Sequence, residues 1–397
     1  MENVSHVYIH VPFCRRRCSY CDFSIAVRSA VPVDKYVESV VAEIQARKIR
    51  LERDSLRSLY LGGGTPSLLG PSGVALLLRQ AGLASGAGDF STLLWKNVEI
   101  TLEANPEDVT SEAVRAWRDA GVNRVSLGVQ SFDSEVLRWM HRGHDARRTA
   151  DSIEVLRGEG IEDVSIDLIA SVPESLARDW ERDLESAIGL EPTHVSVYGL
   201  TVEPQTPLGR WAARGVVAEA PEDRQAAELL RAHERLTGAG YDHYEVSNYA
   251  RPTYRARHNS AYWTRVPYLG LGPSAHGFDG TTRRWNLAAY AAWSDAVGHD
   301  PVGGTEELGS DEQLAEEVYL GLRTTDGLDV YQKDLLTVTS WIEQGWARLS
   351  ARPAGSGSAA DAEAPASGAV GSLRLTPEGW LRLDALAAAL TSARSRS

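Results

Sequence analysis

Cysteine and long apolar runs are the features that this 397-residue chain has least of. All three of its cysteines fall between positions 14 and 21, and an odd, crowded set does not form a disulfide framework, which favours a reducing compartment. No run of eighteen apolar residues occurs, and the start, MENVSHVYIH, has no basic segment followed by an apolar one. These absences argue against a membrane-spanning helix and a signal peptide. We therefore expect a soluble, cytoplasmic protein without an integral membrane segment.

Positive charge is also scarce. The formal net charge is −13, from 41 Lys and Arg against 54 Asp and Glu. Nucleic-acid binding depends on concentrated Lys and Arg, and the run of three arginines at 15–17 is too short to supply it. We expect no nucleic-acid partner. The length exceeds the usual ceiling for one hydrophobic core, which predicts a main domain with an appendage.

Segments of strand length alternate with helical patterns through the first half of the chain. Helical segments such as DKYVESVVAEIQARKI separate the strand-like ones and show one apolar face. Six alternations predict parallel strands joined by right-handed crossovers, arranged as an open α/β sheet or a barrel-like (β/α)6 arc. The six strand-like segments are HVYIHVPF, SLYLGGG, NVEITLEA, NRVSLGVQ, DVSIDLIA and HVSVYGL.

The alternation fails after about Val202, where the chain becomes loop-rich and aromatic. We predict a barrel-like core over 1–240, an aromatic-rich extension over 241–307, and a small C-terminal domain over 308–397. Amphipathic helices and one short strand in the last part predict a helical or winged-helix-like appendage. Residues 351–371 are rich in Ala, Gly, Ser and Pro, which predicts a disordered insertion.

The cysteines lie in the stretch YIHVPFCRRRCSYCDF with the spacing C-x3-C-x2-C. Three thiols this close cannot face one point from a regular strand or helix, so a loop must wrap them around a common centre, which we expect to be a metal. Structural zinc requires a fourth ligand, for which His6 and His10 are the candidates. A [4Fe-4S] cluster held by three cysteines leaves one iron open for a small molecule, and this is the favoured alternative. The predicted metal ligands are Cys14, Cys18 and Cys21.

With an aromatic residue before the last cysteine, the motif resembles the signature of the radical S-adenosylmethionine (SAM) superfamily. The resemblance implies a partial (β/α)6 barrel, a [4Fe-4S] cluster on the three cysteines, and an exchangeable SAM at the open iron. It also implies an electron donor if SAM is cleaved. In parallel α/β folds ligands lie at the carboxyl ends of the strands, which is where the unusual polar and glycine residues of this chain occur.

The motifs GGGTPS, EANP, GVQSF and IDLI narrow the resemblance to the coproporphyrinogen-oxidase-like branch of that superfamily. Two of the residues implied have other interpretations: Arg142 as a solvated charge at a helix end, and Asp167 as a carboxylate that stabilises the fold. The residues that the resemblance implies for SAM binding are Tyr8, Tyr20, Gly63, Gly64, Thr65, Glu103, Gln130, Arg142, Asp167 and Thr201.

Two functions from different classes fit this branch. An oxygen-independent coproporphyrinogen III oxidase has another cysteine two residues after the triplet, where this chain has Phe23. Heme chaperones of the branch show the motif H-N-x-x-Y-W, which occurs here as HNSAYW. The resemblance therefore implies a chaperone that transfers heme to acceptor proteins of the respiratory chain, with the oxidase as the alternative. A radical SAM enzyme with another substrate is a third possibility, so whether the chain is an enzyme stays open.

An imidazole can ligate heme iron, and flat aromatic rings can cover a porphyrin. The HNSAYW segment can equally be ordinary aromatic core. His276 is a competing axial ligand, and the nearby arginines Arg255, Arg257 and Arg265 can pair with propionates. The predicted heme contacts are His258, Asn259, Tyr262 and Trp263.

Overall fold

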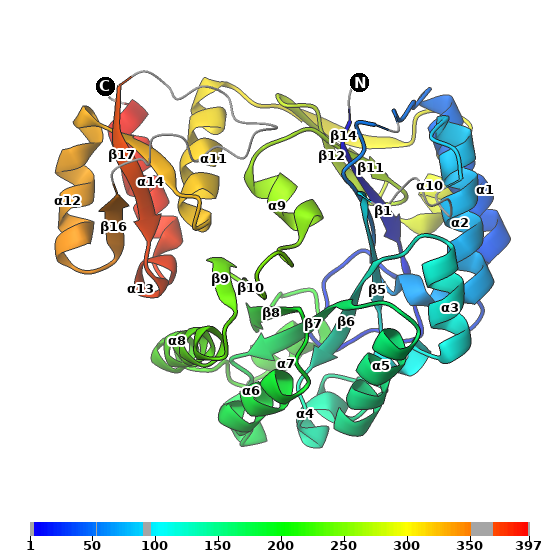
Figure 1. The fold of residues 1–397 in the computed structure, drawn as a ribbon, viewed down its shortest axis with the longest axis horizontal. Coiled ribbons are helices and arrows are strands. Elements are labelled where there is room, and N and C mark those ends of the chain that lie inside the picture. The colour runs from blue at the N-terminus through cyan, green and yellow to red at the C-terminus, as the bar shows by residue number, and fades with distance from the viewer. Residues whose placement is uncertain (1–3, 53, 90–96, 351–367, 396–397) are drawn as a thin grey trace.

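A computed structural model describes residues 4–52, 54–89, 97–350 and 368–395 (Figure 1). Six parallel strands that pair in chain order form the middle of a 12-stranded sheet, which confirms the predicted (β/α)6 alternation. These strands are β1 (His6–Val11), β4 (Ser58–Gly63), β5 (Glu99–Ala104), β6 (Arg124–Gln130), β7 (Asp163–Ala170) and β8 (His194–Gly199).

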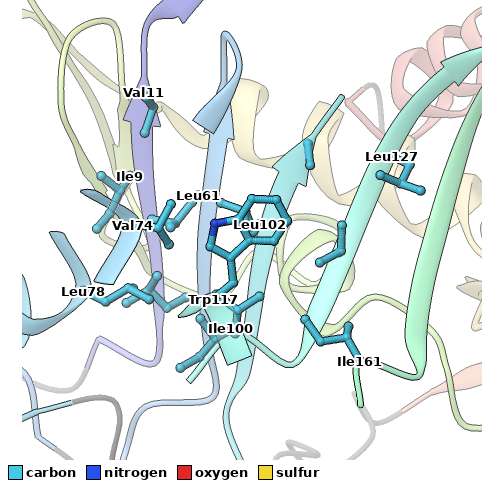
Figure 2. Packing of buried hydrophobic residues seen from close by; sticks show 14 of the residues in the cluster. Ile9, Val11, Leu61, Val74, Leu78, Ile100, Leu102, Trp117, Leu127 and Ile161 are labelled. Atoms are coloured by element: carbon cyan, nitrogen blue, oxygen red, sulfur yellow. The ribbon is translucent and has the colours of Figure 1, made fainter. Parts of the chain in front are cut away.

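Helices cover the outer face of the curved sheet, and the main hydrophobic core lies between the two (Figures 1 and 2). Ile9 and Val11 of β1 belong to this core together with Val74 and Leu78 of α2. Because side chains alternate along a strand, Tyr8 points to the opposite, inner face. The helices are α1 (Val33–Ala46), α2 (Gly70–Ser85), α3 (Ser111–Asp119), α4 (Ser134–Trp139), α5 (Ala146–Gly158), α6 (Trp180–Gly189), α7 (Pro207–Ala213) and α8 (Glu222–Gly238).

The aromatic-rich extension adds strands at both edges of this sheet. Strand β11 pairs in parallel with β1, and β10 pairs antiparallel with β8. The sheet order is therefore β14-β13-β12-β11-β1-β4-β5-β6-β7-β8-β10-β9. The added elements are β9 (Asp242–Glu245), β10 (Asn248–Ala250), α9 (Arg257–Trp263), β11 (Tyr268–Leu271), β12 (His276–Phe278), β13 (Thr282–Asn286), α10 (Tyr290–Ala296) and β14 (Val302–Glu307).

The C-terminal elements form a separate core around a three-stranded antiparallel sheet of order β15-β17-β16. The predicted insertion at 351–371 lies outside the described residues up to position 367, and residues 369–371 begin β17. None of the described helices is long and apolar enough to span a bilayer. The elements are α11 (Ser310–Arg323), β15 (Leu328–Tyr331), α12 (Leu335–Glu343), β16 (Ala347–Ser350), β17 (Ala369–Leu375), α13 (Pro377–Trp380) and α14 (Leu383–Ser395).

Candidate functional site

The cysteine loop is held at both ends and in the middle. Two short strands, β2 (Phe13–Cys14) and β3 (Ala26–Val27), pair in parallel and close the base of the loop. Midway, the buried Ser19 accepts a backbone hydrogen bond from Leu208 at 2.8 Å. These ties fix a segment that has no regular structure of its own, as a loop wrapped around one centre requires.

A cavity of about 230 Å³ opens beside this loop at the carboxyl ends of the barrel strands. It is the place where ligands bind in parallel α/β folds. All three cysteines line it, which brings the predicted metal ligands to one cavity. Most of the predicted SAM contacts line it too; these are Tyr20, Gly63, Gly64, Thr65, Glu103, Arg142 and Asp167.

The cysteine sulfurs have few polar neighbours. Cys14 Sγ lies 3.5 Å from Thr65 Oγ1, and Cys18 Sγ accepts a weak hydrogen bond from Arg142 Nη1 at 3.7 Å. Burial raises the pKa of the Cys21 thiol to about 11. Binding of a metal by this thiol must therefore release a proton at neutral pH.

Within the described ranges, no three His, Cys, Asp or Glu side chains converge on a point that could hold one metal ion. An iron–sulfur cluster is held differently, since each cysteine binds a separate iron. Three thiols on one loop beside this cavity are the donor set of such a cluster.

The glycine triplet at the end of β4 is required by close packing. A Cβ on Gly64 would lie 2.7 Å from the backbone carbon of Pro12, and one on Gly63 would lie 2.5 Å from the His10 ring. Gly63 also has a positive φ of 109°, which side chains strongly disfavour. The glycines thus let the end of β4 press against the cysteine loop, which places both at the cavity.

Two carboxylates, Glu103 on β5 and Asp167 on β7, face the inside of the barrel. Glu103 accepts hydrogen bonds from Tyr60 Oη at 2.8 Å and from the Gly63 backbone at 3.0 Å. Burial, together with the nearby Asp167 carboxylate, raises the pKa of Glu103 to about 7. Burial also raises the pKa of Asp167, although Ser126 donates to both of its oxygens. Buried carboxyls with raised pKa values are typical of functional sites.

Arg142 turns inward, contrary to the interpretation as a solvated charge at a helix end. It donates hydrogen bonds of 2.6 Å to Asn105 Oδ1 and to the Gly128 carbonyl. Gln130, in the left-handed region with φ of 67°, follows an irregularity in the pairing of β6 with β7. Arg142 Nε and Gln130 Oε1 are buried atoms without a partner in the described part of the chain. Such orphaned groups fit a site that a polar ligand completes.

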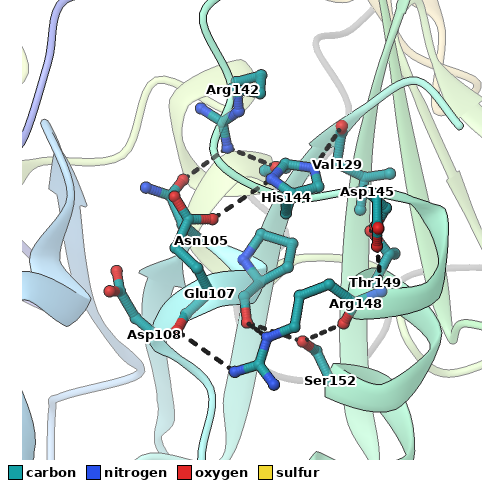
Figure 3. A network of polar contacts seen from close by, with 12 residues as sticks. Asn105, Glu107, Asp108, Val129, Arg142, His144, Asp145, Arg148, Thr149 and Ser152 are labelled. Carbon is teal, nitrogen blue, oxygen red and sulfur yellow. Dashed lines mark hydrogen bonds and ion pairs between the residues drawn. The ribbon is translucent and has the colours of Figure 1, made fainter. Parts of the chain in front are cut away.

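A polar network that the sequence did not reveal supports this side of the cavity (Figure 3). His144 contacts Glu107 through Nδ1 at 3.4 Å and the Val129 carbonyl through Nε2 at 3.1 Å. Burial alone would raise the pKa of Glu107, but hydrogen bonding to His144 and the Arg142 charge lower it to about 2. Asn105, Glu107 and Tyr198 line the cavity as well. Asn105 belongs to the motif EANP, Glu107 follows that motif, and Tyr198 lies within the strand-like segment HVSVYGL.

Three of the predicted SAM contacts are not among the residues that line this cavity. Tyr8 lies on the inner face of β1, where its hydroxyl is 3.0 Å from His10 Nδ1. Gln130 is near the cavity, as described above. Thr201 lies exposed in the segment after β8. Their roles in SAM binding stay predictions.

The HNSAYW segment forms helix α9 at the other end of the barrel. The Glu99 carboxylate caps this helix by accepting hydrogen bonds from the backbones of Arg257 and His258, at 2.7 and 2.9 Å. Glu99 is the first residue of β5, so α9 covers the amino ends of the strands. The cysteine loop lies at their carboxyl ends.

His258 is 1% exposed, and both of its ring nitrogens have partners. Nδ1 lies 2.7 Å from Ser58 Oγ, and Nε2 lies 2.8 Å from Tyr262 Oη. Burial and the neighbouring His6 lower the pKa of His258 to about 3. A heme iron can bind this imidazole only after one of these hydrogen bonds breaks.

The other residues considered for heme binding have contacts of their own. The Arg323 guanidinium lies 4.1 Å from the centre of the Trp263 ring, and Asn259 is half-buried. His276 is exposed and stacks on Trp285 with ring centres 5.7 Å apart. The arginines expected to pair with propionates have other polar partners, namely Asp326 for Arg255, the Asn97 carbonyl for Arg257 and Glu316 for Arg265.

Comparison with known proteins identifies related proteins over most of the chain. Residues 8–187 match the model of the radical SAM superfamily. The heme chaperone HemW of Synechocystis sp. is 36% identical over 360 residues, which cover 85% of both chains. HemW of Escherichia coli is 37% identical over 273 residues, covering 68% of this chain and 69% of that protein.

Among solved structures, coproporphyrinogen III oxidase (HemN) of Escherichia coli superimposes with a TM-score of 0.75. The match covers 98% of this chain and 91% of the oxidase at 20% sequence identity. At that identity the likeness shows the shared fold alone.

Proposed function

The chain belongs to the radical SAM superfamily and, within it, to the family of its HemW relatives, and on this premise we propose that it is a heme chaperone. This chaperone is located in the cytoplasm, where it binds heme. It transfers the heme to acceptor hemoproteins of the respiratory chain. The observation that carries the proposal is the likeness to HemW over 85% of both chains. Phe23, which stands where an oxidase of this branch has another cysteine, supports it.

We assign Cys14, Cys18 and Cys21 as the ligands of a [4Fe-4S] cluster, one thiolate to each of three irons. When bound, such a cluster supplies an open iron for the amino and carboxylate groups of SAM and an electron for its cleavage. Support comes from the cavity that all three cysteines line and from the orphaned buried atoms beside it.

The chain's own residues would then orient SAM. The ionised Glu103 carboxylate would attract the cationic end of SAM. The Arg142 guanidinium would pair with the carboxylate of SAM. The backbone at Gly63 and Gly64 lies open on the same cavity. The other residues proposed to contact SAM are Tyr8, Tyr20, Thr65, Gln130, Asp167 and Thr201. An external electron donor is needed only if SAM is cleaved.

Heme binding by the proposed contacts of the HNSAYW segment requires a change in the structure. His258 must lose its hydrogen bond to Ser58 or to Tyr262 before it can bind iron. Asn259, Tyr262 and Trp263 belong to the same helix, so a movement of α9 would carry all four residues.

A comparison of binding with turnover separates the chaperone from the oxidase. The anaerobically reconstituted protein is titrated with hemin, and in parallel it is incubated with coproporphyrinogen III, SAM and a reductant. We expect a saturable Soret band with hemin and no protoporphyrinogen IX. A Cys21→Ser variant, which cannot complete the cluster, serves as the control for any turnover. Efficient formation of protoporphyrinogen IX by the wild type but not by this variant would overturn the chaperone proposal.

A further inference from the structure

The Arg142 side chain connects the barrel wall with the cysteine loop. Its Nη2 donates to two uncharged acceptors, Asn105 Oδ1 and the Gly128 carbonyl, both at 2.6 Å (Figure 3). Its Nη1 donates a weak hydrogen bond to Cys18 Sγ at 3.7 Å. The guanidinium is therefore held by the wall, and it contacts a proposed ligand of the cluster.

Gly128 leaves room for this guanidinium. It lies on β6, and a Cβ at its position would be 2.8 Å from Arg142 Nη2 and 3.5 Å from Asn105 Oδ1. The first distance is too short for a real contact, so a side chain here would displace the end of Arg142 while its charge remained. Because both acceptors on the wall are uncharged, they fix the guanidinium without cancelling its charge.

The hydrogens of the guanidinium are sufficient for two roles at once. An arginine side chain has five N–H donors. Nη2 uses both of its hydrogens on Asn105 and Gly128, and Nη1 uses one on Cys18. One Nη1 hydrogen and the Nε hydrogen are left, and Nε is a buried atom without a partner in the described part of the chain. The contact with the SAM carboxylate proposed above therefore does not compete with the contact with Cys18.

Cys14 also has a side-chain partner, but this partner is uncharged. Cys14 Sγ lies 3.5 Å from the Thr65 hydroxyl. Hydrogen bonds from a charged donor are roughly twice as strong as those between neutral groups. Hydrogen bonds to the sulfurs and the net charge are among the factors that set the reduction potential of an iron–sulfur cluster. Of the two contacts, only the one from Arg142 brings both a hydrogen bond and a charge.

We infer that Arg142 raises the reduction potential of the proposed [4Fe-4S] cluster through its contact with Cys18. Asn105 and Gly128 are positioning residues for this guanidinium. Reduction transfers one electron from an external reductant to the cluster, which gains one negative charge while no bond forms or breaks. A positive charge and a hydrogen bond at a ligand sulfur stabilise this more negative state. The inference rests on the proposed cluster and does not depend on heme binding.

The test is redox titration of the full-length reconstituted protein without SAM, with dithionite as reductant and the EPR signal of the reduced cluster as readout. We expect Arg142→Gln to lower the midpoint potential by about 59 mV, which is tenfold in the equilibrium constant for one electron. Gly128→Ala, which displaces the charge, should also lower it, and Arg142→Lys should lie between Arg142→Gln and the wild type. The matched control is Arg16→Gln, which removes an exposed charge from the same cavity and should change that constant less than twofold.

Pulsed EPR distinguishes this contact from a general distortion. With ¹⁵N-labelled arginine, the reduced wild type should show a ¹⁵N hyperfine coupling that Arg142→Lys lacks and Arg16→Gln retains. A coupling that persists in Arg142→Lys would overturn the contact. Equal midpoint potentials in the wild type, Arg142→Gln and Gly128→Ala would overturn the inference while the proposed function stands. If Arg142→Gln holds no cluster, the potential of Gly128→Ala decides the question. A wild type that yields no [4Fe-4S] signal on reconstitution would remove the proposed cluster itself.

Discussion

Replacing Glu103 with Gln should make the apoprotein more stable at high pH. The pKa of this carboxyl rises from 4.5 to about 7 on folding, chiefly because of burial. A raised pKa in the folded state gives stability that is fully present below pH 4.5 and is lost as the pH rises through about 7. The shift is worth about 3 kcal/mol once the group is ionised. Glutamine does not titrate, and its amide oxygen can accept from the Gly63 backbone while its amide nitrogen donates to Tyr60 Oη.

Urea unfolding of metal-free wild type and Glu103→Gln at about pH 5.5 and 8.5 measures this effect. The free-energy gap between the two proteins should open by about 2 kcal/mol, because part of the penalty is already present at about pH 5.5. Asp167 titrates in both proteins, so the difference between them reports Glu103 together with its interaction with Asp167. The matched control is Glu107→Gln on the same cavity. Its carboxyl has a pKa lowered to about 2, so this variant should be less stable than the wild type at both pH values. An equal gap for Glu103→Gln at both pH values would refute the reasoning.

Four further outcomes follow from the same contacts. Because the carboxylate of Glu103 is the form that attracts a cation, SAM affinity of the wild type, measured by calorimetry, should rise about tenfold from pH 6 to 8, and this rise should vanish in Glu103→Gln. Arg142→Ala leaves the oxygens of Asn105 and Gly128 unpaired, so urea unfolding should show a loss of about 2–4 kcal/mol; Arg142→Lys should recover part of it. His258→Ala removes the hydrogen bonds to Ser58 and Tyr262 and should cost about 2–4 kcal/mol in the same assay; an unchanged midpoint would show that these bonds contribute nothing. Cys21→Ser should bind less iron per chain on reconstitution than the wild type, measured by iron analysis, and equal iron would exclude Cys21 as a ligand.

The parts of the fold that local sequence controls could be predicted. Strand-like apolar segments alternate with helical patterns, and this alternation predicted the six parallel strands. Each crossover helix directly follows its strand in the chain, so the pattern is local. The extension could not be predicted in the same way, since the pairing of β11 with β1 joins residues more than 250 positions apart: His6 pairs with Tyr268. The sequence of a four-residue strand does not identify a pairing partner so far away in the chain.

The cavity at the cysteine loop was predictable because its residues sit directly after strands, and parallel strands end at one edge. Glu107 and Asn105 were not predicted as site residues, because their role depends on contacts with His144 and Arg142. Those two residues come from the next crossover connection. HNSAYW was predictable as a motif, but its environment was not. The cap from Glu99 and the bonds to Ser58 and Tyr262 arise only when β4, β5 and α9 meet in space.

Transfer of heme is the most direct test of the central claim. The reconstituted protein, loaded with one equivalent of hemin and freed of excess, is mixed with the heme-free form of a respiratory hemoprotein. We expect that the acceptor gains its holoprotein spectrum faster than it does from the same concentration of free hemin, while the Soret band of the donor decays in step. An acceptor that fills no faster than from free hemin, or a donor that keeps its heme, would contradict the account.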